Sequence, residues 1–289
     1  MRPRAQLVVV LVAILLLAIG LRVWGIEYGL PYPYHVDEPT YVSAALNLGA
    51  GLIGKQPNPT GYSNILLGEF AAYYLYGRVT GLFPSTAAFE QAYRSDPSMF
   101  LLLGRLTSVF FGAATILVVY GLGKRSANQN TGVLAALFLA VAFLHVRDSH
   151  YGVPDAPLTF FVSLSTLCCL LVAQTGKKKY LAMAAAVTAY AIVTKWTVWL
   201  VSIPLVIVTV ARLRASSPRV KSRAWPSILI ILATFFFIGF ALGGFQLLLL
   251  PGTYLEYALR EAQAGEAGGF GFWQIDTLSG WLFYVKTLV

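Results

Sequence analysis

Two adjacent carboxylates, Asp37 and Glu38, lie in the segment Y-H-V-D-E-P-T-Y, shortly after a long apolar run. Pro39 suits the first turn of a helix, and Gly49 or Gly51 can end that helix. The pattern therefore predicts that both carboxylates lie at a helix N-terminus, where the helix dipole favours their ionised form. The structural interpretation is a helix cap in a solvated loop. The chemical interpretation is a general base that removes a proton from a hydroxyl group.

A second set of ionisable residues lies in H-V-R-D-S-H-Y-G-V-P-D-A-P-L-T-F-F, between two apolar runs. Arg147, Asp148, His150 and Asp155 fall within nine residues there. Arg147 with Asp148 also fits a plain surface ion pair, and Asp155 also fits a helix cap. A loop this short stays close to the bilayer surface, so we expect these side chains at the level of the lipid headgroups.

Two further cations, Arg105 and Lys195, are also expected near the level of the lipid headgroups. Arg105 lies inside an apolar run, about 10 Å from its outer end at ~1.5 Å per residue, and Lys195 precedes W-T-V-W. An intramembrane charge favours a functional site, although Arg105 can also snorkel outward and Lys195 can anchor an interface. Carboxylates and cations at one face are the groups needed to transfer a substituent from a lipid phosphate to a hydroxyl or amine.

The composition requires a membrane to position these residues. The chain of 289 residues is 57% hydrophobic and 11% charged, with a mean hydropathy of +0.69. Soluble domains average about 25% charged residues. Runs of sufficient length predict an all-α, polytopic fold with about seven or eight transmembrane helices. Seven expected spans are 5–26, 98–122, 131–146, 156–175, 180–194, 196–211 and 225–249. The third, fifth and sixth of them are short. An eighth begins near Ile275, and the chain ends within it at Val289.

The basic residues predict the orientation. With the N-terminus in the cytoplasm, the inner segments hold 12 of the 21 Lys and Arg and none of the 12 Asp and Glu. The N-terminal run lacks a small-residue cleavage site, so we expect an uncleaved first helix. Counting 64–83 as a span would reverse this sorting, and that segment carries Glu69 and Arg78. We therefore expect it to be an interfacial helix within a first outer loop at 27–97.

Several function classes are excluded. The adjacent Cys168 and Cys169 lie in an apolar run and suit small core residues better than a disulfide or a metal site. The basic segments flank membrane helices, so they explain the pI of 9.6 without a nucleic-acid partner. G-L-G-K-R-S at 121–126 follows a spanning helix rather than a strand, which excludes a phosphate-binding loop.

The ordered set of motifs resembles the GT-C superfamily of membrane glycosyltransferases, in particular its protein O-mannosyltransferase-like and aminoarabinose transferase-like branch. The likeness rests on H-V-D-E-P-T-Y, P-N-P-T-G-Y-S-N-I-L-L-G-E-F, G-R-L-T-S-V-F-F-G-A-A-T-I-L-V-V-Y-G-L-G-K-R, R-D-S-H-Y-G-V-P-D-A-P-L-T-F-F and T-K-W-T. It covers residues 1 to about 250 in order, so we expect one GT-C module over 1–289. A common Lys-Pro-Pro-Leu signature of the family is replaced here by N-P-T-G-Y-S-N, near Lys55.

The resemblance implies an inverting, hexosyl- or mannosyltransferase-like enzyme of the cell membrane. It would use a polyprenyl-phosphate sugar donor and a protein, lipid or glycan acceptor on the extracytoplasmic face, without metal or cofactor. It implies that Asp37 is the catalytic base, that Glu38 supports it, and that Asp155 helps to shape the site. Candidate contacts to the donor phosphate or sugar are Arg105, Arg147, His150 and Lys195.

Two other functions remain open at this level. One is a transporter or flippase for a lipid-linked sugar, although such folds place charges near the bilayer midplane. The other is a non-catalytic or truncated membrane subunit, because members of the family usually continue with further spans and often an outer domain. The segment 256–273 predicts a short amphipathic helix and then a Gly-rich stretch, which fits a connecting loop or a mobile lid.

Overall fold

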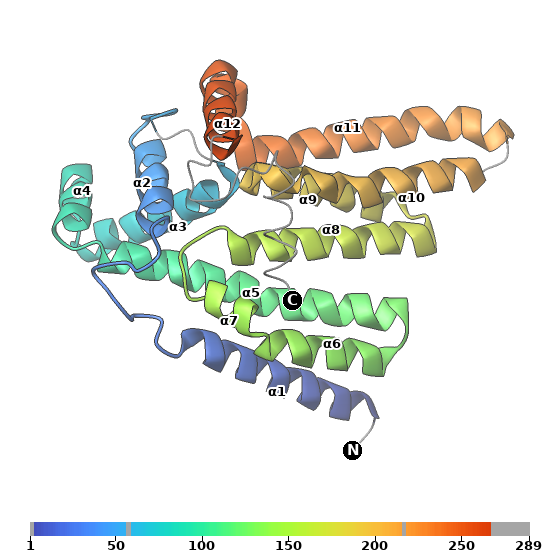
Figure 1. Cartoon of the computed structure of the whole chain (residues 1–289), viewed down its shortest axis with the longest axis horizontal. Coiled ribbons are helices and arrows are strands. Elements are labelled where there is room, and N and C mark those ends of the chain that lie inside the picture. The colour runs from blue at the N-terminus through green and yellow to red at the C-terminus, as the bar shows by residue number, and fades with distance from the viewer. Residues whose placement is uncertain (1–2, 56–58, 216–217, 267–289) are drawn as a thin grey trace.

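The computed structural model describes residues 3–55, 59–215 and 218–266. The elements in these ranges are helices, and none of them is a strand. A bundle of roughly parallel helices forms the body of the molecule (Figure 1). Its members coincide with the seven spans expected before Ile275: α1 (Pro3–Val23), α5 (Ser98–Ser126), α6 (Gln129–Val141), α8 (Asp155–Thr175), α9 (Lys178–Thr194), α10 (Ser202–Ala215) and α11 (Pro218–Leu249).

Helix lengths confirm a polytopic, all-α membrane protein. Among the described residues, five helices are long and apolar enough to cross a bilayer: Ala5–Val23, Ser98–Ser126, Asp155–Thr175, Trp196–Arg214 and Trp225–Leu249. The third and fifth expected spans, α6 and α9, are shorter, with 13 and 17 residues. The sixth, expected over 196–211, consists of the 3₁₀ turn η1 (Trp196–Val201) followed by α10, and it is longer than expected because α10 continues past residue 211. The eighth expected span lies outside the described residues.

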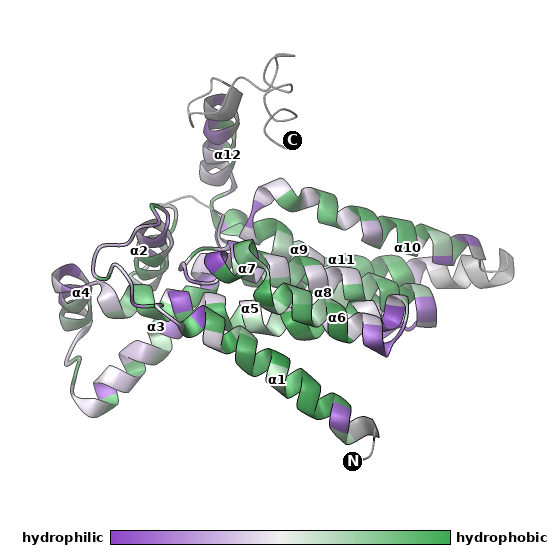
Figure 2. Cartoon of the chain, turned by 60° about the horizontal axis from the view of Figure 1, so that its bottom comes forward, coloured by the Kyte–Doolittle hydropathy of each residue, from purple (hydrophilic) through white to green (hydrophobic). Residues whose placement is uncertain are grey.

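The two ends of the bundle differ in what they carry. At one end lie the turns with Lys124 and Arg125 and with Lys177 to Lys179. At the other, which we call the loop end, α2 (Glu38–Gly49), α4 (Thr86–Ser95) and α12 (Pro251–Glu266) cross the bundle axis (Figure 1). Apolar residues cover the bundle between these ends (Figure 2). This arrangement agrees with the charge sorting of the sequence.

The first loop contains the helices that its sequence predicts. Helix α2 begins at Glu38, with Pro39 in its first turn, and ends at Gly49. Helix α3 (Gly61–Thr80) covers most of the ambiguous segment 64–83, and it is not among the helices apolar enough to span. Polar contacts fix α3 to the bundle: the Tyr62 hydroxyl donates to Gly104 O at 2.8 Å, and the Thr60 hydroxyl donates to Gly243 O at 2.6 Å.

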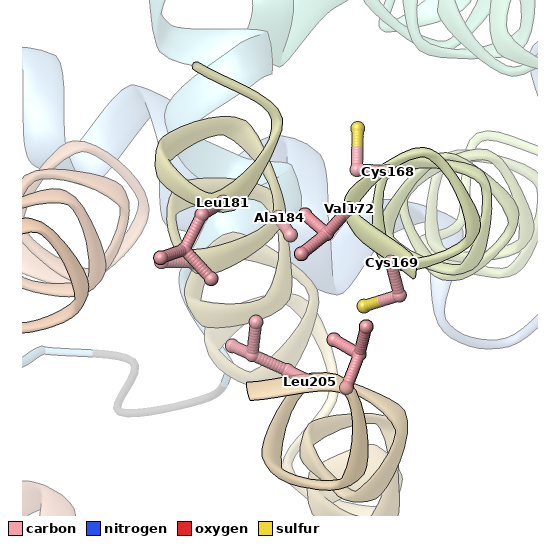
Figure 3. Close-up of a cluster of buried hydrophobic side chains, with 8 residues drawn as sticks. Cys168, Cys169, Val172, Leu181, Ala184 and Leu205 are labelled. Atoms are coloured by element: carbon pink, nitrogen blue, oxygen red, sulfur yellow. The ribbon is translucent and has the colours of Figure 1, made fainter. Parts of the chain in front are cut away.

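The bundle is packed through small residues and apolar clusters. Cys168 and Cys169 of α8 are buried against Leu181 and Ala184 of α9 and Leu205 of α10 (Figure 3), as expected for small core residues. A Cβ atom on Gly239 of α11 would overlap the backbone of α9, so the two helices approach as closely as small residues permit in membrane proteins.

Glu69 of α3 is a partly buried carboxyl group at the contact between α3 and α5. The Thr107 hydroxyl of α5 donates to Glu69 Oε2 at 2.7 Å, while burial raises the pKa of the carboxyl group. A carboxyl group whose pKa is higher in the folded than in the unfolded state stabilises the fold at low pH. This stabilisation is lost as the pH rises through the folded-state pKa. We therefore expect Glu69→Gln to raise the melting temperature in detergent at neutral pH, since an amide oxygen also accepts from Thr107. Each kcal/mol corresponds to about 2–4 °C at this chain length.

The control for this variant is pH. Below about pH 4 the wild-type carboxyl is protonated in both the folded and the unfolded state, so the difference in melting temperature should vanish. A Glu69→Gln protein that melts below wild type at neutral pH would show that the carboxylate stabilises the α3–α5 contact.

Candidate active site

The two neighbouring carboxylates at the start of α2 have different environments. Glu38 is fully buried, and its two oxygens accept from Arg105 Nε at 2.8 Å and Arg105 Nη2 at 2.9 Å. Arg105 itself is only 2% exposed. A two-pronged pairing of this kind matches the planar guanidinium to the carboxylate. Arg105 therefore does not snorkel outward; it is paired inside the loop end.

The remaining hydrogen bonds of this pair join three parts of the chain. Arg105 Nη1 donates to Ile26 O at 2.7 Å and Tyr28 O at 2.9 Å, and the Gly152 N–H donates to Glu38 Oε1 at 2.7 Å. The pair thus holds together the loop after α1, the start of α2, the span α5 and the loop before α8. Buried charges persist only when they are paired and hydrogen-bonded in this way.

Asp37 is not part of that buried pair. It is exposed, and as the N-cap residue of α2 it makes no side-chain capping hydrogen bond. Its backbone N–H donates to His35 Nδ1 at 3.2 Å. The helix dipole favours a carboxylate at this position. Asp37 is therefore an accessible negative group on a backbone that Glu38 fixes.

A pocket of about 470 Å³ opens beside this helix start. Arg105 and Tyr151 border it, and they also contact Glu38 and His35 respectively. The pocket is thus connected to the residues that flank Asp37. Its lining consists of Gly25, Tyr28, Tyr34, Arg105, Arg147, His150 and Tyr151.

Two side chains of the second loop, Arg147 and His150, line the pocket. Arg147 is half exposed, and its guanidinium pairs with Asp148 at 2.7 Å. The two ring nitrogens of His150 contact Val146 O at 2.8 Å and Trp24 O at 3.0 Å. Both contacts are hydrogen bonds when the ring carries two protons. Arg147 therefore gives the pocket a partly exposed guanidinium group that can bind an anion.

A tyrosine pair forms the wall of the pocket that follows α1. The rings of Tyr28 and Tyr34 stack with centroids 5.2 Å apart and planes inclined by 13°. Gly29 lies beneath them with φ +86°, and a Cβ atom there would lie 2.6 Å from Tyr34 Cε2. The loop therefore requires glycine both for its backbone angle and for the space that the ring occupies.

Gly29→Ala should consequently disturb this wall. A left-handed alanine costs about 1–2 kcal/mol, and the methyl group displaces Tyr34. We expect weaker binding of polyprenyl phosphate, measured by equilibrium binding to the purified chain. Gly51→Ala is the matched control, because Gly51 has φ +76° with open space around the added carbon. Equal binding by the two variants would show that the ring position is unimportant.

A second polar cluster lies on another side of Asp37. Lys195 Nζ and Asp155 Oδ1 are 2.9 Å apart, and both side chains are about 40% exposed. Burial and then the charges of Asp37 and Asp155 raise the pKa of the Tyr41 hydroxyl. Burial and then Glu261, with a smaller effect of Asp37, raise the pKa of Tyr257 to about 12. These carboxylates and phenols therefore face one another around the start of α2.

Six of the seven expected site residues fall into three pairs, and the seventh, Asp37, is the exposed N-cap residue of α2. Glu38 and Arg105 form the buried pair, Arg147 and His150 line the pocket, and Asp155 with Lys195 forms the exposed pair. Asp155 does not cap α8, because Pro154 is the N-cap and Asp155 is the first helical residue. Lys55 is exposed and does not line the pocket. No group of three metal-binding side chains occurs in the described parts of the chain.

Arg22 is an organising residue that the sequence analysis missed. It is fully buried near the end of α1, and it donates to Ala140 O at 3.1 Å and His145 Nδ1 at 2.7 Å. These contacts close the C-terminal end of α6 and fix α7 (Phe143–Asp148), the short helix that carries Arg147. The available signal was a cation near the end of an apolar run.

Two comparisons with known proteins gave matches. The sequence profile described as dolichyl-phosphate-mannose-protein mannosyltransferase matches residues 99–241, about half of the chain. An uncharacterized protein of Aquifex aeolicus (strain VF5) is 32% identical over 62 residues, which are 21% of this chain and 12% of that protein. The profile match begins at the span that carries Arg105 and runs into α11. The chain belongs to the dolichyl-phosphate-mannose-protein mannosyltransferase family, which is of the GT-C type.

Proposed function

We propose that this protein is a membrane glycosyltransferase that moves a sugar from a polyprenyl-phosphate donor to a hydroxyl or similar group of an acceptor. The observation that carries the proposal is the placement of Asp37. Asp37 is accessible, and its neighbours Glu38 and His35 contact Arg105 and Tyr151, which line the pocket that also contains Arg147 and His150. Family membership supports the reaction class, and the pocket supports an anionic donor.

The chemistry follows from these two parts. The acceptor oxygen attacks the anomeric carbon as the bond from that carbon to the phosphate oxygen breaks, and the configuration inverts. Asp37 takes the proton of the acceptor hydroxyl. The departing polyprenyl phosphate gains negative charge, which the half-exposed Arg147 guanidinium stabilises, with His150 beside it in the pocket lining. The polyprenyl phosphate leaves as a phosphate monoester, and the reaction needs no metal ion to neutralise its charge.

The buried pair has a positioning role in this scheme. Arg105 borders the pocket, but its nitrogens already donate to Glu38, Ile26 O and Tyr28 O. We therefore assign Arg105 and Glu38 to holding Asp37 and the pocket wall in register, with Arg105 contributing positive charge. The Asp155–Lys195 pair shapes the side from which the acceptor approaches, together with Tyr41 and Tyr257.

The loop end would face the extracytoplasmic side of the cell membrane. The turns with Lys124, Arg125 and Lys177 to Lys179 lie at the opposite end of the bundle, and such segments stay in the cytoplasm. Acceptors on that face are proteins, lipids or glycans. In this scheme the acceptor hydroxyl and the donor headgroup meet at the loop end, which carries α2, α4 and α12.

A time course with the purified full chain tests the proposal. The probes are radiolabelled undecaprenyl- and dolichyl-phosphate mannose, offered with a library of serine- and threonine-rich peptides and with glycolipids. We expect labelled acceptor and free polyprenyl phosphate to appear together. A flippase in proteoliposomes would move the intact labelled lipid between leaflets, and a non-catalytic subunit would leave it unchanged in both assays.

A further inference from the structure

His35 lies between the base and the pocket, and neither the expected site nor the family match assigns it a role. Its Nδ1 atom is 3.2 Å from the backbone nitrogen of Asp37. Its ring packs against that of Tyr151, with centroids 5.1 Å apart and planes inclined by 48°. Tyr151 in turn lines the pocket. The imidazole therefore contacts both the backbone of Asp37 and a ring that lines the cavity.

The contact with Asp37 determines which ring nitrogen carries the hydrogen. A backbone N–H can only donate, so Nδ1 must accept and must be unprotonated. The neutral ring then carries its hydrogen on Nε2. One side of the ring thus holds the backbone of the base, and the other side presents a single N–H donor.

We propose that His35 is a donor-binding residue whose Nε2–H binds a phosphoryl oxygen of the lipid-linked sugar at the rim of the pocket. This inference rests on the proposed function. The pocket otherwise offers Arg147, which is engaged with Asp148, and His150, which contacts two backbone carbonyls. In His35, the backbone N–H of Asp37 occupies Nδ1, so the ring hydrogen lies on Nε2. His35 orients the phosphate relative to Asp37.

Two substitutions separate the two sides of the ring. In His35→Asn, the amide oxygen can replace Nδ1 as the acceptor for the Asp37 N–H, but nothing replaces Nε2–H. In His35→Gln, the longer amide can place an N–H near the Nε2 position, but it loses the contact with Asp37. We expect His35→Asn to raise the donor KM about 10- to 100-fold, the range for one hydrogen bond to a charged group. His35→Gln should stay within about threefold of wild type in donor KM, and the acceptor KM should be unchanged in both.

Binding of undecaprenyl phosphate without sugar gives a second readout that does not need turnover. The same order, wild type similar to His35→Gln and tighter than His35→Asn, is expected, with melting temperatures as the check on folding. If His35→Asn binds and transfers like wild type while His35→Gln is impaired, the ring only fixes the loop and the inference is wrong. Equal losses in both variants also overturn it. Wild-type protein that binds the lipid but transfers nothing would instead count against the proposed function.

Discussion

Asp37→Asn should reduce sugar transfer by about 10²- to 10⁴-fold, the usual contribution of a positioned general base. Asparagine has the same shape as aspartate but cannot take a proton from the acceptor hydroxyl. The side chain is exposed and makes no capping hydrogen bond, so the fold should survive the change. The measurement is the initial rate of mannose transfer from the labelled lipid, with the melting temperature and lipid binding recorded on the same preparation.

The matched control is another exposed carboxylate at the loop end. Glu90 of α4 is 62% exposed and pairs with Arg94 one turn away. Glu90→Gln should therefore transfer sugar at the wild-type rate. Asp37→Asn should bind undecaprenyl phosphate as wild type does, because the pocket cations are untouched. Wild-type turnover in Asp37→Asn would remove Asp37 as the base and leave the pocket as a binding site alone.

Much of the architecture could be predicted from local patterns. Apolar runs gave the helices of the bundle, and Pro39 and Gly49 marked the two ends of α2. These features depend on neighbours in the chain, which is why they can be read without a structure. The interfacial assignment of α3 followed from the sorting of basic residues between the loops and from Glu69 and Arg78, whose charges make a span costly.

The partners of the charged residues could not be predicted in the same way. Arg105 and Glu38 are 67 positions apart, and Arg22 and His145 are 123 apart. Only the packing of the bundle brings such pairs together, so an intramembrane arginine looks equally suitable for a ligand, a lipid or a buried carboxylate. His35 carried no signal beyond its place near Asp37, because its tautomer depends on one backbone contact.

Arg105→Met should strongly destabilise the loop end, by about 3–5 kcal/mol, because it leaves the Glu38 carboxylate buried without its partner. The backbone oxygens of Ile26 and Tyr28 lose their donors in the same change. Glu38→Gln should destabilise for the converse reason. A free phosphate-binding arginine would behave differently: its loss would raise the donor KM and leave the melting temperature near that of wild type. Thermal unfolding in detergent therefore distinguishes the two roles.

The double variant Glu38→Gln with Arg105→Met completes the argument, because it removes both charges at once. We expect it to be more stable than Arg105→Met alone, since no unpaired charge remains buried, while transfer stays low because Asp37 is no longer held in place. The exposed Glu90–Arg94 pair provides the comparison, with a coupling below about 1 kcal/mol. Strictly additive effects at Glu38 and Arg105 would show that the buried pair does not act as one unit.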